Sequence, residues 1–194
     1  MSEENKDLNN SNNKENIVEK KLLETRSIFI YGEINQELAQ KVSSQLIILS
    51  SISDEPIKIY LNSQGGHVEA GDTIHDMIKF VKPEIKMIGT GWVASAGVTI
   101  YLAAEKENRF MLPNTRFMIH QPMGGTQGQI TDMEIEVEEV KRMRKRLNNL
   151  IANATGQNFE KVEKDTERNY WMSPEETIDY GIASKVISSF SEIE

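Results

Sequence analysis

The sequence predicts an α/β fold built around a largely parallel sheet. Short runs rich in Ile, Phe, Tyr and Met, each bounded by turn residues, alternate with segments whose apolar residues recur at helical spacing. This alternation is typical of repeated βαβ units, in which a helix crosses over between two parallel strands. The 194 residues, with 38% hydrophobic content, are sufficient for one domain with its own core.

Four strands and three intervening helices are predicted in this pattern. The strands cover residues 27–31, 57–62, 86–89 and 116–119. The helices cover residues 35–49, 67–81 and 94–104. The last of these is small or apolar on nearly all sides, so we expect it to be buried.

A fourth and longer helix is predicted over residues 131–153. Thr131 and Glu134 match a capping box at its start, and Gly156 lies just past its end. Acidic residues fill the first half and basic residues the second, an arrangement that suits the helix dipole. We interpret the basic half as a solvated helix end rather than as a nucleic-acid patch.

The composition excludes several classes of protein. A net charge of −8 lacks the basic footprint of a general nucleic-acid-binding protein. The absence of cysteine excludes disulfides, thiolate metal sites and a cysteine nucleophile. The chain has no run of about 18 apolar residues, so no transmembrane helix is predicted, and the N-terminus lacks the pattern of a signal peptide. We therefore expect a cytoplasmic protein with no membrane and no nucleic-acid partner.

Two regions are expected along the chain. Residues 1–21 are rich in asparagine and charged side chains, so they bury too little apolar surface to offset the entropy of ordering. We expect a flexible polar tail that becomes helical near its end. Residues 22–194 are expected to form a single domain.

His120 and Ser95 are the side chains that could carry chemistry. His120 follows an apolar strand, and the carboxyl ends of parallel strands are where ligands and catalysts gather. A histidine packed in the core remains an open alternative. Ser95 lies between a strand and a helix, where it could be an N-cap or a nucleophile. Gly65 and Gly66 lie at another strand-to-helix turn, where backbone N–H groups could stabilise an oxyanion.

The remaining histidines do not suggest a metal site. His67 and His75 lie eight residues apart on a predicted helix, without an HExxH motif or a carboxylate at ligand spacing. We interpret both as surface positions and expect no metal.

Four segments carry a resemblance to a known family. They are NSQGGHVEAG, FVKPEIKMIGTGWVASAG, FMLPNTRFMIHQPMGGTQGQITDMEIE and KVEKDTERNYWMSPEETIDYG. Together they resemble the proteolytic subunit of the ATP-dependent Clp protease, ClpP, and the resemblance runs from about residue 25 to residue 186. It implies a ClpP/crotonase-like fold and a serine endopeptidase. The implied nucleophile is Ser95, the general base is His120, and the oxyanion donors are the backbone N–H groups of Gly66 and Ala96.

The resemblance also implies an assembly. Subunits of this family form two stacked heptameric rings that enclose a chamber, and the long helix belongs to the ring–ring contact as a handle. An ATP-driven AAA+ unfoldase feeds the chamber, so this chain itself needs no cofactor. Glu167 and Arg168 match a pair that reports on assembly. A strand within residues 124–129 would pair with bound peptide, and its implied substrate-binding residues are Gly124, Gly125, Thr126 and Gln127.

Three features depart from the family pattern. Asn169 aligns with the aspartate of the catalytic triad, and Asp165 is an alternative partner for the histidine. The polar tail replaces an apolar axial segment. Lys58 occupies a position that is usually aromatic or apolar in the unfoldase-docking pocket, although Tyr60 and Phe80 fit. These departures suggest a divergent paralogue.

Two alternatives to an active peptidase stay open. One is a weakly active or inactive regulatory subunit, in mixed rings with a standard paralogue. The other is a crotonase-type acyl-CoA enzyme, which shares the fold and the oxyanion chemistry but needs no serine–histidine pair.

Overall fold

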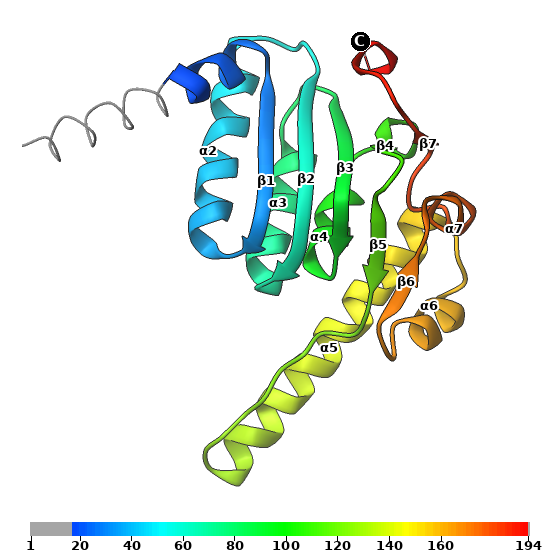
Figure 1. The fold of residues 1–194 in the computed structure, drawn as a ribbon. Coiled ribbons are helices and arrows are strands. Elements are labelled where there is room, and N and C mark those ends of the chain that lie inside the picture. The colour runs from blue at the N-terminus through cyan, green and yellow to red at the C-terminus, as the bar shows by residue number, and fades with distance from the viewer. Residues whose placement is uncertain (1–16, 194) are drawn as a thin grey trace, which may run out of the picture.

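The fold begins with three successive strand–helix units (Figure 1). The computed structural model describes residues 17–193, with a short helix over residues 17–24 before the first strand. The units are β1 (Ser27–Ile34) with α2 (Gln36–Ile52), β2 (Ile57–Gly66) with α3 (Val68–Phe80), and β3 (Ile85–Ala94) with α4 (Ala96–Tyr101). The three strands are parallel neighbours, and the helices cover one face of the sheet. The predicted α/β fold is confirmed. Most of the predicted tail, residues 1–16, lies outside the described residues.

Four shorter strands complete the sheet. They are β4 (Arg109–Met111), β5 (Arg116–Ile119), β6 (Tyr170–Met172) and β7 (Lys185–Val186). β4 pairs with the middle of β3 and with β7, whereas β5 pairs with the last residues of β3. β6 pairs with β5 and is antiparallel to it. The neighbour of β3 thus changes along its length, and β5 takes the place beside the end that leads into Ser95.

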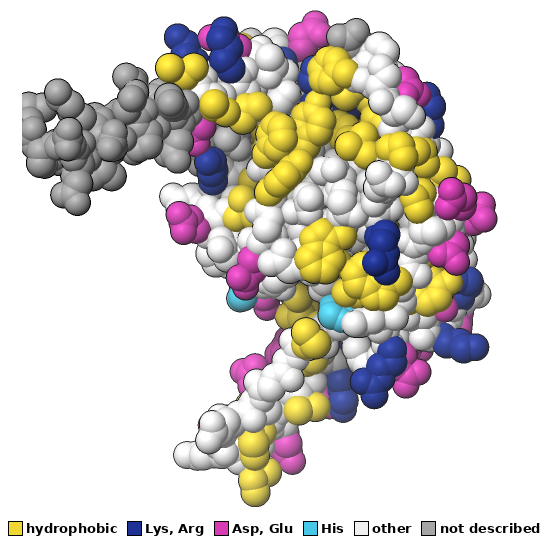
Figure 2. Space-filling model, viewed as in Figure 1, with side chains coloured by type: hydrophobic (Ala, Val, Ile, Leu, Met, Phe, Trp, Pro, Cys, Tyr) yellow, Lys and Arg dark blue, Asp and Glu magenta, His cyan; other side chains and the backbone are white. Residues whose placement is uncertain are grey.

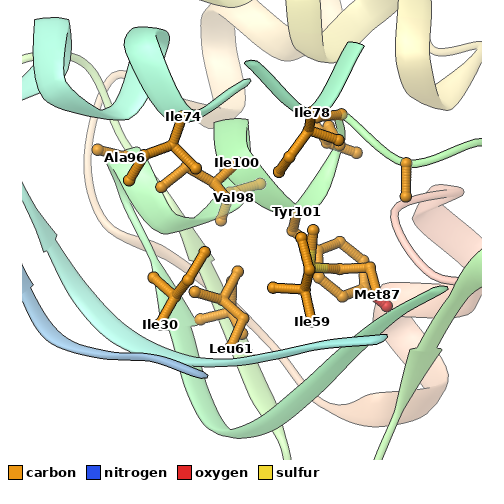
Figure 3. Packing of buried hydrophobic residues seen from close by; sticks show 14 of the residues in the cluster. Ile30, Ile59, Leu61, Ile74, Ile78, Met87, Ala96, Val98, Ile100 and Tyr101 are labelled. Carbon is orange, nitrogen blue, oxygen red and sulfur yellow. The ribbon is translucent and has the colours of Figure 1, made fainter. Parts of the chain in front are cut away.

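The core lies between the sheet and α2, α3 and α4. Figure 3 shows β-strand side chains that point toward α3 and α4. The labelled residues are Ile30, Ile59, Leu61, Met87, Ile74, Ile78, Ala96, Val98, Ile100 and Tyr101. Nearly all are fully buried, and burial of each large apolar side chain contributes about 1.5–3 kcal/mol. This packing fixes where β3 ends and α4 begins.

The long helix α5 (Ile130–Thr155) extends away from the sheet (Figure 1). Its 26 residues span about 39 Å. Only the last part packs on the body, through buried residues such as Leu147 and Ile151. Arg146 joins this part to α3 through a bidentate ion pair with Asp72, with N–O distances of 2.9 and 2.5 Å.

The ends of α5 test the predicted caps. Gly156 caps the C-terminus with a left-handed φ of 76°, as its position predicts. The predicted capping box is wrong, because the helix begins at Ile130 and its N-cap is Gln129, which makes no side-chain cap bond. Thr131 is therefore already inside the first turn and cannot cap it.

Two shorter helices follow α5, namely α6 (Phe159–Asp165) and α7 (Pro174–Tyr180). The 3₁₀ turn η1 (Lys106–Asn108) precedes β4, and η2 (Phe190–Glu192) lies near the C-terminus. Near the C-terminus, Lys86 donates a 2.6 Å hydrogen bond to the carbonyl of Ile193. Hydrophobic side chains also gather on the face that α2, α3 and α4 leave uncovered (Figure 2), and Phe29 and Tyr31 are more than 40% exposed. Within residues 17–193, no helix has the length and apolar character needed to cross a membrane.

Candidate active site

Ser95 occupies a strained turn between β3 and α4. Its φ of 56° and ψ of −125° lie in a region that few residues other than glycine adopt. Its backbone N–H donates to the carbonyl of Met118 at 2.9 Å, which ties the turn to β5. Ser95 stands at the N-cap position of α4, but its side chain makes no cap bond. The N-cap interpretation is therefore wrong for the hydroxyl, which faces His120 instead.

His120 connects Ser95 with Asn169. Its Nε2 lies 2.8 Å from the Ser95 Oγ, and its Nδ1 lies 3.1 Å from the Asn169 Oδ1. An amide oxygen only accepts hydrogen bonds, so this contact places the ring proton on Nδ1. Nε2 is then left as an acceptor for the serine hydroxyl. The interpretation of His120 as a packed core histidine does not hold.

The register of β5 and β6 accounts for this meeting. Ile119 on β5 lies opposite Tyr170 on β6 in an antiparallel pair. His120 follows Ile119 and Asn169 precedes Tyr170, so the next position of the same ladder places these two side chains opposite each other. Residues 49 apart in the sequence meet because of this pairing.

Asp165 does not contact His120. Its Oδ2 accepts a 2.9 Å hydrogen bond from the Tyr180 hydroxyl and pairs with Lys161 at 2.6 Å. Burial raises the pKa of the Tyr180 phenol, and the hydrogen bond to Asp165 raises it further, so this phenol stays a donor. The alternative in which Asp165 replaces the missing aspartate is therefore wrong for this structure.

Of the two glycines at the end of β2, Gly65 lies beside Ser95. A Cβ on Gly65 would come within 2.6 Å of the Ser95 Cβ and 2.9 Å of the Ala94 carbonyl oxygen. Gly66 is close to β1, and a Cβ there would lie 2.2 Å from the Ile34 carbonyl oxygen. On the other side, Ala96 is the first residue of α4, where the backbone N–H has no partner within the helix.

Replacement of Gly65 by alanine is expected to lower peptide hydrolysis by roughly 10²-fold, the usual cost of a misplacement of about 1 Å. The added methyl group would overlap with Ser95, so the serine must move. The φ of +97° at Gly65 is also one that alanine rarely adopts. Peptide turnover at unchanged native mass measures the effect. Gly32→Ala is the matched control, because Gly32 also has a positive φ of +81° but a Cβ there meets nothing within 4 Å. Full activity of Gly65→Ala would contradict this close packing.

A small, mainly apolar pocket opens next to the serine. Ser95 and His120 line it together with residues from α3, α4, α5 and the end of β5. Its apolar lining includes Val68, Ala96, Ile119, Pro122, Leu147 and Ile151.

The segment after His120 differs from the prediction in one respect. Gly124, Gly125, Thr126 and Gln127 were expected in a strand, but residues 121–129 have no strand structure and are mostly exposed. An extended segment forms a ladder only when a second strand lies beside it, and none pairs with it within the described residues. Instead, Gly124, Gly125 and Thr126 line a groove together with residues of α5.

The pair Glu167 and Arg168 lies directly before Asn169, and both side chains are exposed. The Glu167 carbonyl accepts a 2.8 Å hydrogen bond from the Gln121 side chain, and the Gln121 N–H donates to the Thr166 carbonyl at 2.5 Å. Gln121 is thus a positioning residue that the sequence analysis missed. Its place directly after His120 is the only signal that could have indicated it.

The other two histidines have structural contacts. His67 is the N-cap of α3 and accepts from the Ala70 N–H at 3.3 Å. His75 is half-buried, with its Nδ1 2.7 Å from the Thr99 carbonyl oxygen, so it is not the simple surface residue expected. In the part of the chain that the structure describes, no three His, Cys, Asp or Glu side chains form a group that could hold a metal ion.

Comparison with known proteins gives a consistent result. The sequence profile of the family described as Clp protease matches residues 9–190. The ATP-dependent Clp protease proteolytic subunit 3 of Rhizobium etli is 60% identical over 175 residues, which cover 90% of each chain. Subunit 2 of Treponema denticola is 43% identical over 194 residues, covering 100% of this chain and 97% of the relative.

Solved structures of the same family superpose closely on this one. ClpP1 from Listeria monocytogenes has a TM-score of 0.83 at 60% identity, covering 91% of this chain and 99% of that chain. An asparagine-to-aspartate mutant of that protein has a TM-score of 0.86 at 61% identity, with the same coverage. With its fold, its motifs and the geometry around Ser95 in agreement, the chain belongs to the Clp protease family of serine endopeptidases.

Proposed function

We propose that this chain is the proteolytic subunit of a barrel-shaped protease in which Ser95, His120 and Asn169 form the catalytic triad. The observation that carries the proposal is the continuous contact from the Ser95 Oγ to His120, at 2.8 Å, and from His120 to Asn169, at 3.1 Å. The base is thus within hydrogen-bond distance of both the nucleophile and the orienting group without any bound substrate.

The reaction follows from these contacts. The Ser95 Oγ attacks the peptide carbonyl carbon while His120 Nε2 takes the hydroxyl proton. The backbone N–H groups of Gly66 and Ala96 stabilise the negative oxygen of the tetrahedral intermediate. The C–N bond then breaks, and His120 returns the proton to the leaving amine. Water, activated by His120, cleaves the acyl ester and restores Ser95.

Asn169 supports the triad in a limited way. Its amide oxygen holds His120 with Nδ1 protonated, which is the tautomer that the reaction needs. An amide lacks the negative charge that stabilises the imidazolium formed during catalysis, so turnover is expected to be low. This is also the observation that favours a second candidate function, a weakly active or inactive regulatory subunit in mixed rings with a standard paralogue.

The proposed assembly is two stacked heptameric rings, with α5 in the contact between rings. Three apolar residues of the protruding half of α5 are exposed in the single chain: Ile130 at 73%, Ile135 at 56% and Val137 at 44%. Large apolar side chains on a protruding helix are typical of a surface that another copy covers. Glu167 and Arg168 are proposed to respond to ring assembly. In this assembly Gly124, Gly125, Thr126 and Gln127 would become a strand when substrate peptide pairs with them.

An AAA+ unfoldase is the proposed partner, and the proposed location is the cytoplasm. The unfoldase would use ATP, so the peptidase chain needs no cofactor. Phe80 is 76% exposed and available for docking. Lys58 lies 5.1 Å from the ring centroid of Phe190 and places a positive charge near Tyr60, so an unfoldase that docks here is expected to differ from one that binds an apolar pocket.

The direct test is to label the purified protein with a serine-directed fluorophosphonate and to determine its native mass. Seven copies of the 22.1 kDa chain give about 155 kDa and fourteen give about 309 kDa. We expect labelling of Ser95 in a ring-sized species, since the hydroxyl is already paired with its base. Assembled rings that are not labelled would favour the regulatory function instead.

A further inference from the structure

Each residue of the triad is adjacent to the end of a different strand. Ser95 follows β3, His120 follows β5, and Asn169 precedes β6. The distances among the three side chains therefore depend on how these strands are held against one another.

One side chain from each of the same strands meets in a stack. The rings of Trp92 on β3 and Trp171 on β6 are parallel within 1°, with centroids 6.1 Å apart. The guanidinium carbon of Arg116 on β5 lies 4.4 Å from the centroid of the Trp171 ring, within the range of a cation–π interaction. The strand register supports this contact. Trp92 lies opposite Arg116, and Trp171 lies opposite Met118, which is two residues after Arg116 and so on the same face of β5.

The stack lies on the face of the sheet opposite the main core. Val93, Phe117 and Met172, the direct neighbours of the stacked residues, are buried in that core. Successive side chains of a strand point to opposite faces, so Trp92, Arg116 and Trp171 point away from it. β6 is thus held from one face by Met172 and from the other by the stack.

β6 needs such support because it is short. It has three residues and pairs with β5 as its only partner among the described strands. Asn169 directly precedes it, so a shift of β6 would move the amide away from His120. A neutral amide also forms a weaker bond to the imidazole than a carboxylate would, and is less able to correct a shift.

We propose that Trp92, Arg116 and Trp171 form a clamp that positions Asn169 against His120 by fixing β6 to β5 and β3. The three are positioning residues, since within residues 17–193 none of their side chains forms a hydrogen bond with Ser95, His120 or Asn169. The proposal rests on the function proposed above for the triad.

Trp171→Leu tests the clamp. We expect kcat to fall roughly tenfold with less than a twofold change in KM, the pattern of a misplaced general base. Trp171→Phe keeps a ring for Arg116 and should restore most of kcat. A crystal structure of the assembled Leu variant should show the His120 Nδ1 beyond hydrogen-bond distance of the Asn169 Oδ1.

Phe190→Leu is the matched control. It removes another exposed aromatic ring that makes a cation–π contact, since the Lys58 Nζ lies 5.1 Å from the Phe190 ring centroid. Lys58 is near the start of β2, whereas Ser95 follows the far end of the neighbouring β3, so kcat should stay unchanged.

The outcomes separate the clamp from the triad. Assembled Trp171→Leu with kcat within twofold of the parent and an unchanged His120–Asn169 contact would overturn the clamp. If the parent itself does not hydrolyse peptide, the proposed function fails, but the crystal structures of parent and variant still decide whether the clamp holds Asn169. If Trp171→Leu does not assemble, Arg116→Gln, a smaller change at an exposed position, is assessed by the same two measurements. In an Asn169→Asp background, the loss of kcat caused by Trp171→Leu should be smaller, because a hydrogen bond to a carboxylate holds His120 more firmly than one to an amide.

Discussion

Replacement of Ser95 by alanine is expected to reduce peptide hydrolysis by about 10²-fold, to background. A complete triad contributes roughly 10⁶-fold in a serine protease, and an asparagine in place of the aspartate removes about 10⁴ of that. A rate enhancement of about 10²-fold therefore remains in this protein, and it is lost when the nucleophile is removed. Turnover of a small fluorogenic peptide measures the loss, and fluorophosphonate labelling should disappear with it.

The fold should tolerate this change. The Ser95 side chain makes no cap bond to α4, so its removal leaves the helix terminus as it was. The native mass should be that of the parent. Ser44→Ala is a matched control, since Ser44 is exposed on α2 and its hydroxyl bonds only to the Gln40 carbonyl. A Ser95→Ala protein that retains the parent rate would remove Ser95 from the mechanism.

Most helices and strands from β1 to α5 were predictable, because each carries an apolar run or a repeated apolar stripe within its own sequence. The strand predicted over residues 116–119 is β5 without change, and the helix predicted over 67–81 is α3 together with its two caps. The strand predicted over residues 86–89 ended there because Gly89 and Gly91 interrupt the apolar run, whereas β3 extends to Ala94. Pairing with β2 and β5 keeps those residues extended.

The short strands could not be predicted. β4, β6 and β7 have two or three residues each, too few to show the alternation that marks a strand. They exist because a neighbouring strand provides their hydrogen bonds, which a local pattern does not reveal. The consequence is largest for β6, because its pairing brings Asn169 to His120.

A residue of the candidate site was predictable from the sequence where the strand that carries it was predictable. Ser95 and His120 follow strands that the sequence indicates, so their meeting at one sheet edge was a reasonable expectation. Asn169 was assigned through the family resemblance alone, since its local pattern is that of a polar loop. The stack of Trp92, Arg116 and Trp171 depends on three strands at once, one of them unpredicted.

Replacement of Asn169 by aspartate is expected to give the largest effect of any single change, a gain in turnover that approaches 10⁴-fold. The carboxylate would accept the same Nδ1 proton that the amide oxygen accepts at 3.1 Å, and would add the negative charge that stabilises the imidazolium. Ser95, the glycines beside it and the tautomer of His120 stay as they are. The gain should therefore appear in kcat rather than in KM, measured with a small peptide on assembled rings.

The matched control is Asn158→Asp. Asn158 is the N-cap of α6, and its side chain accepts from the Glu160 N–H, a role that aspartate fills equally well. It adds the same charge to the chain without a contact to His120, so turnover should not change. A large gain for Asn169→Asp alone would mean that the orienting group is what limits the wild-type triad, and the chain would be a peptidase of low activity. If both variants keep the parent rate at the parent's native mass, Asn169 is not the group that limits turnover.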